Sequence, residues 1–285
     1  MGVNLRPGNP ADADTAGRIC YDAFAAIAAE HNFPCDFPSS ELAQFVVAAL
    51  LGNPSIYSVV AEVDGQVAGS NFLDERCPIA GVGPITVDPV SQDHAVGKLL
   101  MEDVMRRAAE RGFPGVRLVQ AGYHNRSFSL YAKLGFEVRE QLACLQGAPV
   151  ASTVPGYAVR PAVSADLEVC NALCVSVHGH HRGGELADAV AQGSARVVEH
   201  AGRISGYATD VAFFAHAVGE SNEDLKALIG AAELYAGPGI LVPTRNSSLL
   251  GWCLENQLRM VQLMTLMTTG IYSQPAGAWL PSILF

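Results

Sequence analysis

Two hydrophobic periods follow one another along the first half of the chain and predict alternating helices and strands. Apolar residues that recur every three or four positions predict amphipathic helices, whereas short runs of β-branched and apolar residues between turn residues predict strands. In chain order, the predicted elements are a strand at 5–7, a helix capped by Asp12 or Asp14, a helix capped by Ser39 or Ser40, a hairpin of 58–62 and 66–73, a strand at 83–87, a helix ending at 111, a strand at 116–121, a helix from 125 and a strand at 141–145.

The second half of the chain repeats this plan after a segment that contains Gly, Pro and Ser. A near-constant offset of 121 to 122 residues over a whole helix indicates an internal duplication. The matched positions are Arg6 and Asp12 with Arg160 and Asp166, 65–69 with 202–206, Asn125 with Asn246, and Phe136 with Leu258. We therefore predict two domains, 1–146 and 157–285, joined by a linker at 147–156.

Composition favours a protein with packed cores. Of the 285 residues, 49% are hydrophobic and 16% charged, which suits two domains. No apolar run approaches the roughly 18 residues that span a bilayer, and no signal pattern begins the chain, so we expect a cytoplasmic protein with no membrane partner. The seven cysteines form no C-x-x-C pair, so we expect neither a disulfide framework nor a metal site. The formal charge of −10 argues against a nucleic-acid partner and mildly favours a cationic one.

A phosphate-binding loop is predicted after Val87-Asp88-Pro89. There a predicted strand runs into a turn of small residues that opens a helix, so backbone N–H groups and the positive end of the helix dipole point at one spot. Gly97 is expected to permit the tight backbone of this turn. The turn has neither G-x-x-x-x-G-K-[ST] nor G-x-G-x-x-G, which excludes the P-loop and the dinucleotide fingerprint.

The turn from Gln92 to Gly97 resembles the acetyl-coenzyme A loop of the GNAT N-acetyltransferase superfamily, which is usually [QR]-x-x-G-x-[GA]. Ala95 stands where the family usually has Gly, and its methyl group is tolerated if the residue keeps φ below zero. Residues 125–138, with Leu-Tyr-x-Lys-Leu-Gly-Phe after Asn125, are similar to the family's second signature. Two motifs in the family's order identify the N-terminal half as a member. The resemblance implies an α/β fold of the α+β kind with a mixed sheet, built from two tandem GNAT-like domains.

The resemblance implies that the protein transfers an acetyl group from acetyl-CoA to the primary amine of a small molecule. Transfer would occur by direct attack in a ternary complex, without a metal. Strand backbone would pair with the pantetheine arm, and the loop would hold the pyrophosphate. The implied coenzyme-binding residues are Ile85, Thr86, Val87, Gln92, Asp93, His94, Ala95, Val96, Gly97, Lys98, Asn125, Ser127 and Tyr131.

Two residues are predicted to carry the chemistry. The resemblance gives Tyr131 the role of the general acid that protonates the leaving thiolate, against the alternative of a core aromatic. Family members often carry a Glu on the Val-Asp-Pro strand as the base, but this strand offers none. We therefore predict Glu75, at the end of the preceding strand, as the catalytic base, and the alternative is a solvated hairpin end.

The acceptor is expected to enter near the first two predicted helices and the loop between them. An aromatic wall for an amine substrate is predicted there, and the alternative assigns the same rings to the core. The four aromatic residues are Phe24, Phe33, Phe37 and Phe72.

The second domain departs from the first at the coenzyme loop. Glu220, Glu223 and Asp224 put negative charges at the predicted helix start, where they satisfy the dipole and repel phosphate. We therefore predict that this degenerate domain binds no coenzyme. The ending over 271–281 resembles that of the YitH-like tandem subgroup.

Two alternatives for the function stay open. One is an acyltransferase that uses a longer acyl chain or modifies a protein lysine. The other is a non-catalytic acyl-CoA sensor whose degenerate domain binds a partner or forms a homodimer. Retention of Tyr131 favours catalysis, because a pure binder needs no proton donor there.

Overall fold

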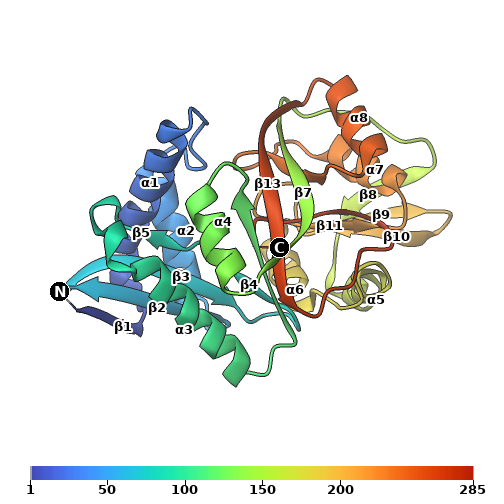
Figure 1. Ribbon diagram of the computed structural model, residues 1–285. Coiled ribbons are helices and arrows are strands. Elements are labelled where there is room, and N and C mark those ends of the chain that lie inside the picture. The colour runs from blue at the N-terminus through green and yellow to red at the C-terminus, as the bar shows by residue number, and fades with distance from the viewer. Residues whose placement is uncertain (1, 285) are drawn as a thin grey trace.

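The computed structural model describes residues 2–284, except for the side chains of Gln92, Asp93 and His94. The two halves of the chain lie side by side, with strands of both halves between them (Figure 1). The first half contains β1 (Val3–Pro7), α1 (Ala13–Glu30), α2 (Ser40–Gly52), β2 (Ile56–Val63), β3 (Gln66–Asp74), β4 (Ala80–Val82), β5 (Thr86–Val87), η2 (Pro89–His94), α3 (Val96–Glu110), β6 (Gly115–Ala121), α4 (Asn125–Lys133) and β7 (Glu137–Gln146). The second half contains β8 (Tyr157–Pro161), α5 (Leu167–His178), α6 (Gly183–Gln192), β9 (Arg196–His200), β10 (Arg203–Ala208), β11 (Ala217–Gly219), α7 (Asn222–Ala231), β12 (Ile240–Pro243), α8 (Ser247–Glu255), β13 (Arg259–Gly270) and β14 (Ala278–Leu280).

The element order of the first half recurs in the second, and an ion pair recurs with it. Arg6 on β1 pairs with Asp12 before α1 at 2.7 Å. Arg160 on β8 pairs with Asp166 before α5 at the same distance. Each arginine also binds a glutamate of the neighbouring strand. The structure thus contains the duplication that the sequence pattern indicates.

The helices α4 and α8, near the end of each repeat, show which residues of the two repeats correspond. α4 begins at residue 125 and α8 at residue 247, an offset of 122 residues. The caps of these helices are His124 and Asn246. The predicted match of Asn125 with Asn246 is therefore wrong by one position, because Asn246 corresponds to His124.

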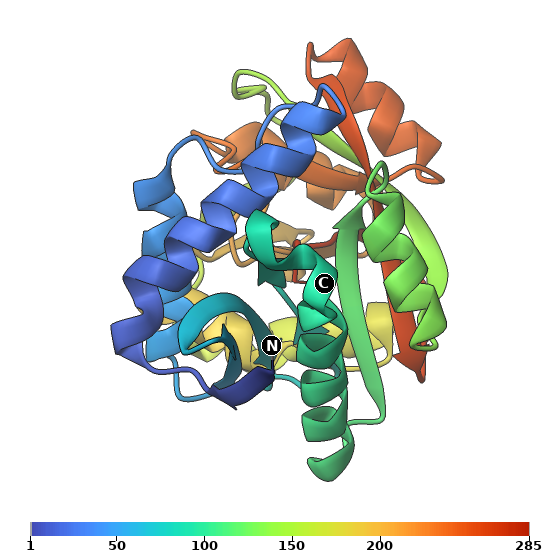
Figure 2. The same ribbon diagram turned by 60° about the vertical axis from the view of Figure 1, so that its left-hand side comes forward.

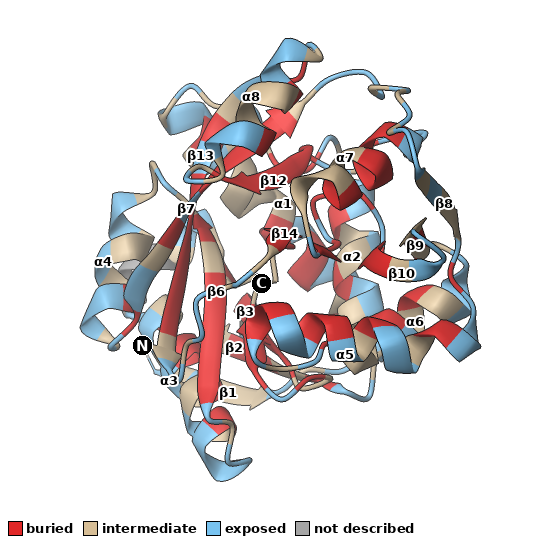
Figure 3. Ribbon diagram, turned by 90° about the vertical axis from the view of Figure 1, so that its right-hand side faces the viewer, coloured by how far each residue is buried: buried red, intermediate tan, exposed pale blue. Residues whose placement is uncertain are grey.

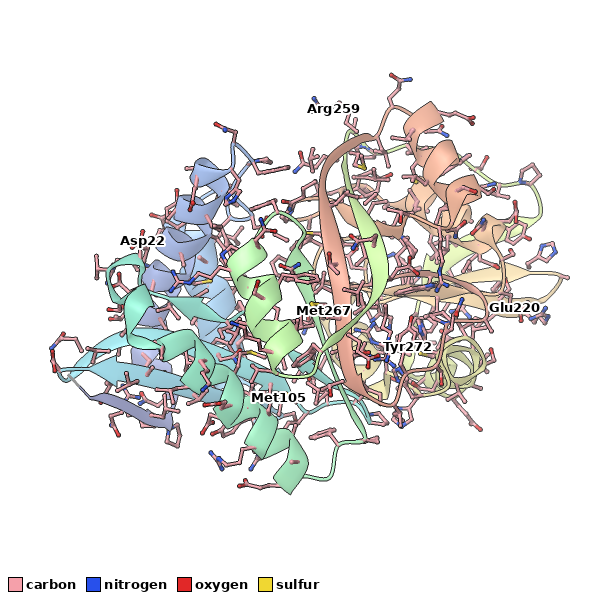
Figure 4. All side chains as sticks on the ribbon, viewed as in Figure 1. Asp22, Met105, Glu220, Arg259, Met267 and Tyr272 are labelled. Atoms are coloured by element: carbon pink, nitrogen blue, oxygen red, sulfur yellow. The ribbon has the colours of Figure 1, made fainter. Side chains whose placement is uncertain are left out.

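β13 of the second half is inserted between β6 and β7 of the first half. It pairs antiparallel with both, and Met267 lies opposite Leu118 on one side and Val138 on the other. β7 also pairs with β12, so the order across the centre is β6-β13-β7-β12. Met267 accordingly lies where the two halves meet (Figure 4). Each repeat thus places one strand between two strands of the other, β13 between β6 and β7, and β7 between β13 and β12.

Alternation along β3 assigns the two faces of the first half's sheet. Leu73 packs with Leu100 and Leu118 in the core under α3 and α4. Phe72 packs with Ala16 in a separate core formed with α1 and α2. Because neighbouring residues of a strand point to opposite faces, α3 and α4 cover one face and α1 and α2 the other. β6 is buried over most of its length (Figure 3).

The mixed sheet expected from the sequence is confirmed, since β4 and β6 pair in parallel and the other neighbours pair antiparallel. Of the predicted strand at 83–87, only residues 86–87 form a strand, β5, and the separate strand β4 lies before it at 80–82. Within residues 2–284, no helix combines the length and the apolar character needed to cross a bilayer.

Candidate active site

β5 and β6 diverge and leave a space in the sheet, which we call the N-terminal wedge. β4 pairs with β6 through Ala80 and Gly81, but β5 pairs only with β3 among the described strands. The edge of β5 that faces β6 therefore has free backbone N–H and C=O groups, with which an extended ligand can pair as a further strand would. The predicted coenzyme residues Ile85, Thr86 and Val87 lie along this edge.

α3 begins beside the N-terminal wedge, after η2, which lies next to α1 (Figure 2). In the described structure no side chain caps α3, and its first turn has no acidic residue. The first backbone N–H groups of a helix lack partners within the helix, so those of Val96, Gly97 and Lys98 lie at the positive end of its dipole. Such an uncapped helix start binds an anion.

Three side chains of the predicted coenzyme loop lie outside the residues that the structure describes. The backbone of Gln92, Asp93 and His94 forms η2, but their side chains are outside the described residues, so their contacts stay a prediction. The side chain of Lys98 is exposed and pairs with Glu102 at 3.4 Å.

Two expectations for the loop backbone are wrong. Ala95, between η2 and α3, has a φ of 57°, whereas the sequence argument for its methyl group required φ below zero. This left-handed conformation favours glycine. Gly97 is helical, and a Cβ added there would meet Val87 at 3.6 Å and Leu130 at 4.0 Å, which are ordinary contacts. Gly97 therefore keeps space open between α3, β5 and α4 and does not make the tight turn.

A buried amide on β6 borders the N-terminal wedge. Gln120 is 6% exposed, and neither its Oε1 nor its Nε2 has a hydrogen-bond partner among the described residues. It lies on the same face of β6 as Leu118, under α3 and α4. A buried amide without partners indicates a ligand that supplies them. Sequence reasoning missed Gln120, whose only signal was a polar residue within the apolar strand predicted at 116–121.

Tyr131 is buried on α4. It is 5% exposed, and its ring centroid lies 6.2 Å from that of Phe136. Burial raises the pKa of the Tyr131 phenol to about 12, and a hydrogen bond with Ser127 opposes this shift. A pKa this high keeps the phenol protonated at neutral pH, as a proton donor requires. The same packing also suits a core aromatic, so the geometry accommodates both roles.

Asn125 and Ser127 lie in the first turn of α4, before Tyr131. His124 caps the helix, because its Nδ1 accepts a hydrogen bond from the backbone N–H of Ser127 at 3.1 Å. The side chain of Asn125 is exposed to solvent. The structure therefore places the predicted coenzyme residues of α4 in two environments, an exposed first turn and a buried second one.

Glu75 lies at the opposite end of α3 from the loop. Arg107 donates to both of its carboxylate oxygens, at 2.6 and 2.9 Å, and Arg111 lies 3.6 Å away. Arg107 is about three helical turns, or about 16 Å, beyond the start of α3. The structure thus does not bring Glu75 together with residues 85–98. The alternative of a solvated hairpin end does not describe it either, because the side chain is mostly buried.

β4, which offers no carboxylate as a catalytic base, is covered by Leu284 near the C-terminus. A Cβ added to Gly81 would collide with the carbonyl oxygen of Leu284. Gly81 lies opposite Asp74, whose carboxylate pairs with Arg76. No side chain fits at position 81 while residue 284 lies against it, which gives the missing glutamate of this strand a structural reason.

The corresponding helix start in the second half is closed by its own side chains. The buried carboxylate of Asp224 accepts hydrogen bonds from the backbone N–H and the hydroxyl of Ser221, both at 2.9 Å. Glu220 pairs with Arg203, and Glu223 with a lysine of α7. Asp224 therefore caps the N-terminus of α7, whereas Glu220 and Glu223 are engaged in ion pairs beside it.

The C-terminal segment fills the space between β11 and β12, which corresponds to the N-terminal wedge. β14 pairs antiparallel with β11, with Trp279 opposite Val218. It also packs against β12 (Figure 3). The second half thus holds a strand of its own chain where the first half has a free strand edge.

The predicted acceptor-site phenylalanines divide between two groups. The rings of Phe24 and Phe37 make an edge contact with centroids 5.5 Å apart, and Phe72 is buried in the same core. Phe33 instead stacks on Tyr123, with ring centroids 4.3 Å apart. Sequence reasoning missed Tyr123, because nothing local shows that the residue after β6 meets the loop between α1 and α2.

Comparisons with known proteins agree with this architecture. Residues 24–136 match the family model described as Acetyltransferase (GNAT) family. Among curated proteins, no sequence matches the chain.

Solved structures match over nearly the whole chain. A Pyrococcus horikoshii protein assigned as an acetyltransferase has a TM-score of 0.73 and 16% identity, covering 95% of this chain and 90% of that one. A GCN5-related N-acetyltransferase from Sphaerobacter thermophilus has a TM-score of 0.61 and 13% identity, with 95% and 96% covered. A tandem GNAT protein from the clavulanic acid biosynthesis pathway has a TM-score of 0.55 and 14% identity, with 94% and 98% covered. At such low identity these likenesses establish the fold.

Proposed function

Residues 24–136 are a domain of the GNAT acetyltransferase family, and from that premise we propose that the protein is an acyl-CoA-dependent N-acetyltransferase. The primary amine of a small molecule, once it has lost its ammonium proton to solvent, attacks the thioester carbonyl of acetyl-CoA directly, and the further proton that the nitrogen loses as the amide forms also passes to solvent. The contrast between the two repeats carries the proposal. The first has an uncapped helix start beside a free strand edge, whereas the second is closed by acidic caps and by β14.

The residues around the N-terminal wedge fit an acyl-CoA. Backbone groups of Ile85, Thr86 and Val87 would pair with the amides of the pantetheine arm, and the N–H groups that begin α3 would hold the pyrophosphate. Gln120 offers a donor and an acceptor to the same ligand. When bound, the coenzyme supplies a thioester with an electrophilic carbonyl carbon and a sulfur leaving group.

Tyr131 is the proposed general acid. Its phenol, kept protonated by the raised pKa, donates its proton to the sulfur as the carbon–sulfur bond breaks. Glu75 is not part of this proposal, because Arg107 engages both of its oxygens at the far end of α3. The residues of the wedge therefore supply binding, orientation and one proton.

Acetyl transfer to a panel of primary amines, followed by release of free thiol, tests the proposal. Wild-type protein should acetylate at least one amine. Gly97→Glu should abolish transfer, because it places a carboxylate where the helix start would hold the pyrophosphate. Gly251→Glu adds the same charge to α8, where an added Cβ meets nothing within 4 Å, and should keep wild-type activity. Undiminished transfer by a folded Gly97→Glu variant would contradict the proposal.

A non-catalytic acyl-CoA sensor is the second candidate function. One observation favours it, namely that β4 and β5 carry no carboxylate and Leu284 covers Gly81. A sensor would bind acetyl-CoA and acetylate no amine of the panel. The same panel, repeated with longer acyl-CoA donors and with lysine peptides, separates the remaining acyltransferase alternatives.

A further inference from the structure

A buried carboxylate on the loop between α1 and α2 has no counter-ion. Asp36 is 9% exposed, and its Oδ1 accepts a hydrogen bond from Nε2 of Gln262 at 3.1 Å. Among the side chains that the structure describes, no lysine, arginine or histidine forms an ion pair with it. A buried charge is strongly unfavourable unless it is paired. An unpaired one on a loop beside a candidate site therefore indicates a ligand of opposite charge.

The partner of Asp36 is itself incompletely bonded. Gln262 is on β13 and is buried, and its Oε1 has no hydrogen-bond partner in the described part of the chain. Its amide nitrogen is directed to Asp36, which leaves this oxygen as a second free acceptor beside the carboxylate. Two acceptors without donors at one place fit a ligand that carries several N–H donors.

Four titratable groups lie close enough to Asp36 for its charge to raise their pKa values, and none of them is a base. They are Cys20 on α1, Cys35 on the same loop, Tyr123 after β6 and Cys144 on β7. Burial, together with the charge of Asp36, raises the pKa of each of these groups, so all four are neutral at pH 7. None of these four groups compensates the charge of Asp36, and His31, whose ring centroid lies 5.3 Å from that of Tyr123, forms no ion pair with Asp36 in the described structure.

The aromatic residues Phe33 and Phe37 stand before and after Asp36 in the same loop, and each of them lies near a further ring. Phe33 is stacked on Tyr123, with ring planes 9° apart. Phe37 lies 6.4 Å, between ring centroids, from Phe214 of the second half, which is partly exposed. Aromatic faces attract organic cations and contact their hydrocarbon parts. A carboxylate among such rings suits an organic ammonium better than a hydrated metal ion.

This group of residues lies near the open end of the N-terminal wedge. Gly122, just beyond β6, donates to the carbonyl oxygen of Leu263, so the neighbouring Gln262 is level with the end of β6. Phe37 belongs to the core of α1 and α2, on the face opposite α3 and α4. Asp36 therefore faces the sheet from the side opposite to the helix that would hold the pyrophosphate.

We propose that Asp36 and Gln262 bind the ammonium group of the acceptor, a small primary amine with an apolar or aromatic body. The proposal rests on the proposed function for the identity of this ligand as the acceptor. The ammonium donates one hydrogen bond to the free oxygen of Asp36 and one to Oε1 of Gln262. Its hydrocarbon part lies against Phe33, Phe37 and Tyr123. Asp36 is thus a recognition residue that determines specificity for a cation.

Three ligands of one shape but different charge test this inference. The full-length protein, without coenzyme, is titrated calorimetrically at pH 7 with 2-phenylethylammonium, 2-phenylethanol and 3-phenylpropionate. We expect the ammonium to bind about tenfold more tightly than the alcohol and the carboxylate not to bind. Asp36→Asn should weaken ammonium binding by about tenfold and leave alcohol binding unchanged.

Control variants keep the test decisive. Glu41→Gln removes an exposed charge from the start of α2 and should not change ammonium binding. Gln262→Met keeps the size of the side chain without its amide and should weaken ammonium binding, so it serves if Asp36→Asn does not fold. Equal affinity for the ammonium and the alcohol, no binding of the ammonium, or an unchanged affinity in Asp36→Asn would each overturn the inference.

A parallel titration with acetyl-CoA separates this inference from the proposed function. Coenzyme binding without ammonium binding would contradict the role of Asp36 alone. Ammonium binding without coenzyme binding would contradict the proposed acetyltransferase and leave a cation-binding site.

Discussion

Ala95 holds a backbone conformation that a side chain disfavours, at the point where η2 meets α3. A left-handed conformation costs a non-glycine residue about 1–2 kcal/mol. Alanine recovers part of this cost, because it restricts the unfolded chain more than glycine does. We therefore predict that Ala95→Gly raises the free energy of unfolding by about 0.5–1 kcal/mol, measured by urea denaturation. Ala232→Gly, at a position with a φ of −71°, should lower it, and equal effects of both variants would refute the argument.

Asp36 provides a prediction that depends on pH. Burial raises the pKa of its carboxyl, and the hydrogen bond from Gln262 opposes the shift. A raised folded-state pKa means that stability is lost as the pH rises through it, because the protein then holds a buried charge. Asp36→Asn should therefore be more stable than wild type at pH 7, with the difference vanishing below the ordinary carboxyl pKa of 3.8. Thermal unfolding from pH 3 to 7 measures this, and a variant less stable at pH 7 would contradict it.

Tyr131→Phe tests the catalytic role of a single hydroxyl. General acid catalysis typically contributes about 10²–10⁴ in rate, so kcat should fall by at least about 100-fold. The affinity for acetyl-CoA should not change, because the ring remains in the core. Steady-state kinetics and a coenzyme titration of the same variant separate the two effects. Unchanged turnover would assign Tyr131 to the core alone.

Several site residues could not be predicted because their roles depend on distant parts of the chain. Asp36 lies in the loop between the first two predicted helices, and nothing local in the sequence shows that it is buried without a cation. The prediction of Glu75 as the catalytic base rests on its closeness in sequence to the strand that ends in Val87. Its partner Arg107 lies at the end of α3, which sequence order alone does not reveal.

At the scale of the elements, local patterns predicted most helices and strands of both halves. They also predicted that α7 would satisfy its own N-terminus, since the acidic residues lie within one turn. The pattern predicts a strand over 83–87, whereas only residues 86–87 are extended in the sheet, as β5. The match of Asn125 with Asn246 was off by one, because both residues stand beside the cap of their helix and only the backbone distinguishes them.

The caps of α3 and α7 support an element-scale prediction. Asp224 is buried and bonds to Ser221 and to Ser205, so it fixes α7 to β10. Asp224→Ala should lower the free energy of unfolding by about 1–3 kcal/mol, because it removes a cap and leaves buried donors unpaired. Acetyl-CoA binding should be unaffected, since the N-terminal wedge is elsewhere. Denaturant unfolding measures the loss of stability, and calorimetry measures coenzyme binding. An unchanged free energy of unfolding would contradict the role of Asp224 as a cap, and a second coenzyme site in the variant would contradict the prediction of unaffected binding.

At the scale of the whole molecule, the exchange of strands makes the halves interdependent. β13 supplies the neighbour of both β6 and β7, so residues 1–149 alone would expose the edges of two central strands. We predict that this fragment aggregates or associates through those edges when it is expressed alone. Size-exclusion chromatography and circular dichroism measure the outcome. A monomeric fragment with cooperative unfolding would contradict the prediction. Sequence could show the duplication but not this exchange, because it joins strands more than a hundred residues apart.

We propose that each chain binds one acyl-CoA, in the N-terminal wedge. The corresponding place in the second half binds none, because β14 lies between β11 and β12 and acidic residues lie at the start of α7. Calorimetric titration of acetyl-CoA into the full-length protein, with Gly97→Glu and Gly251→Glu as the paired variants, counts the sites directly. The account predicts one site per chain, lost in Gly97→Glu and retained in Gly251→Glu. Two sites per chain, or a site that survives in Gly97→Glu, would contradict it.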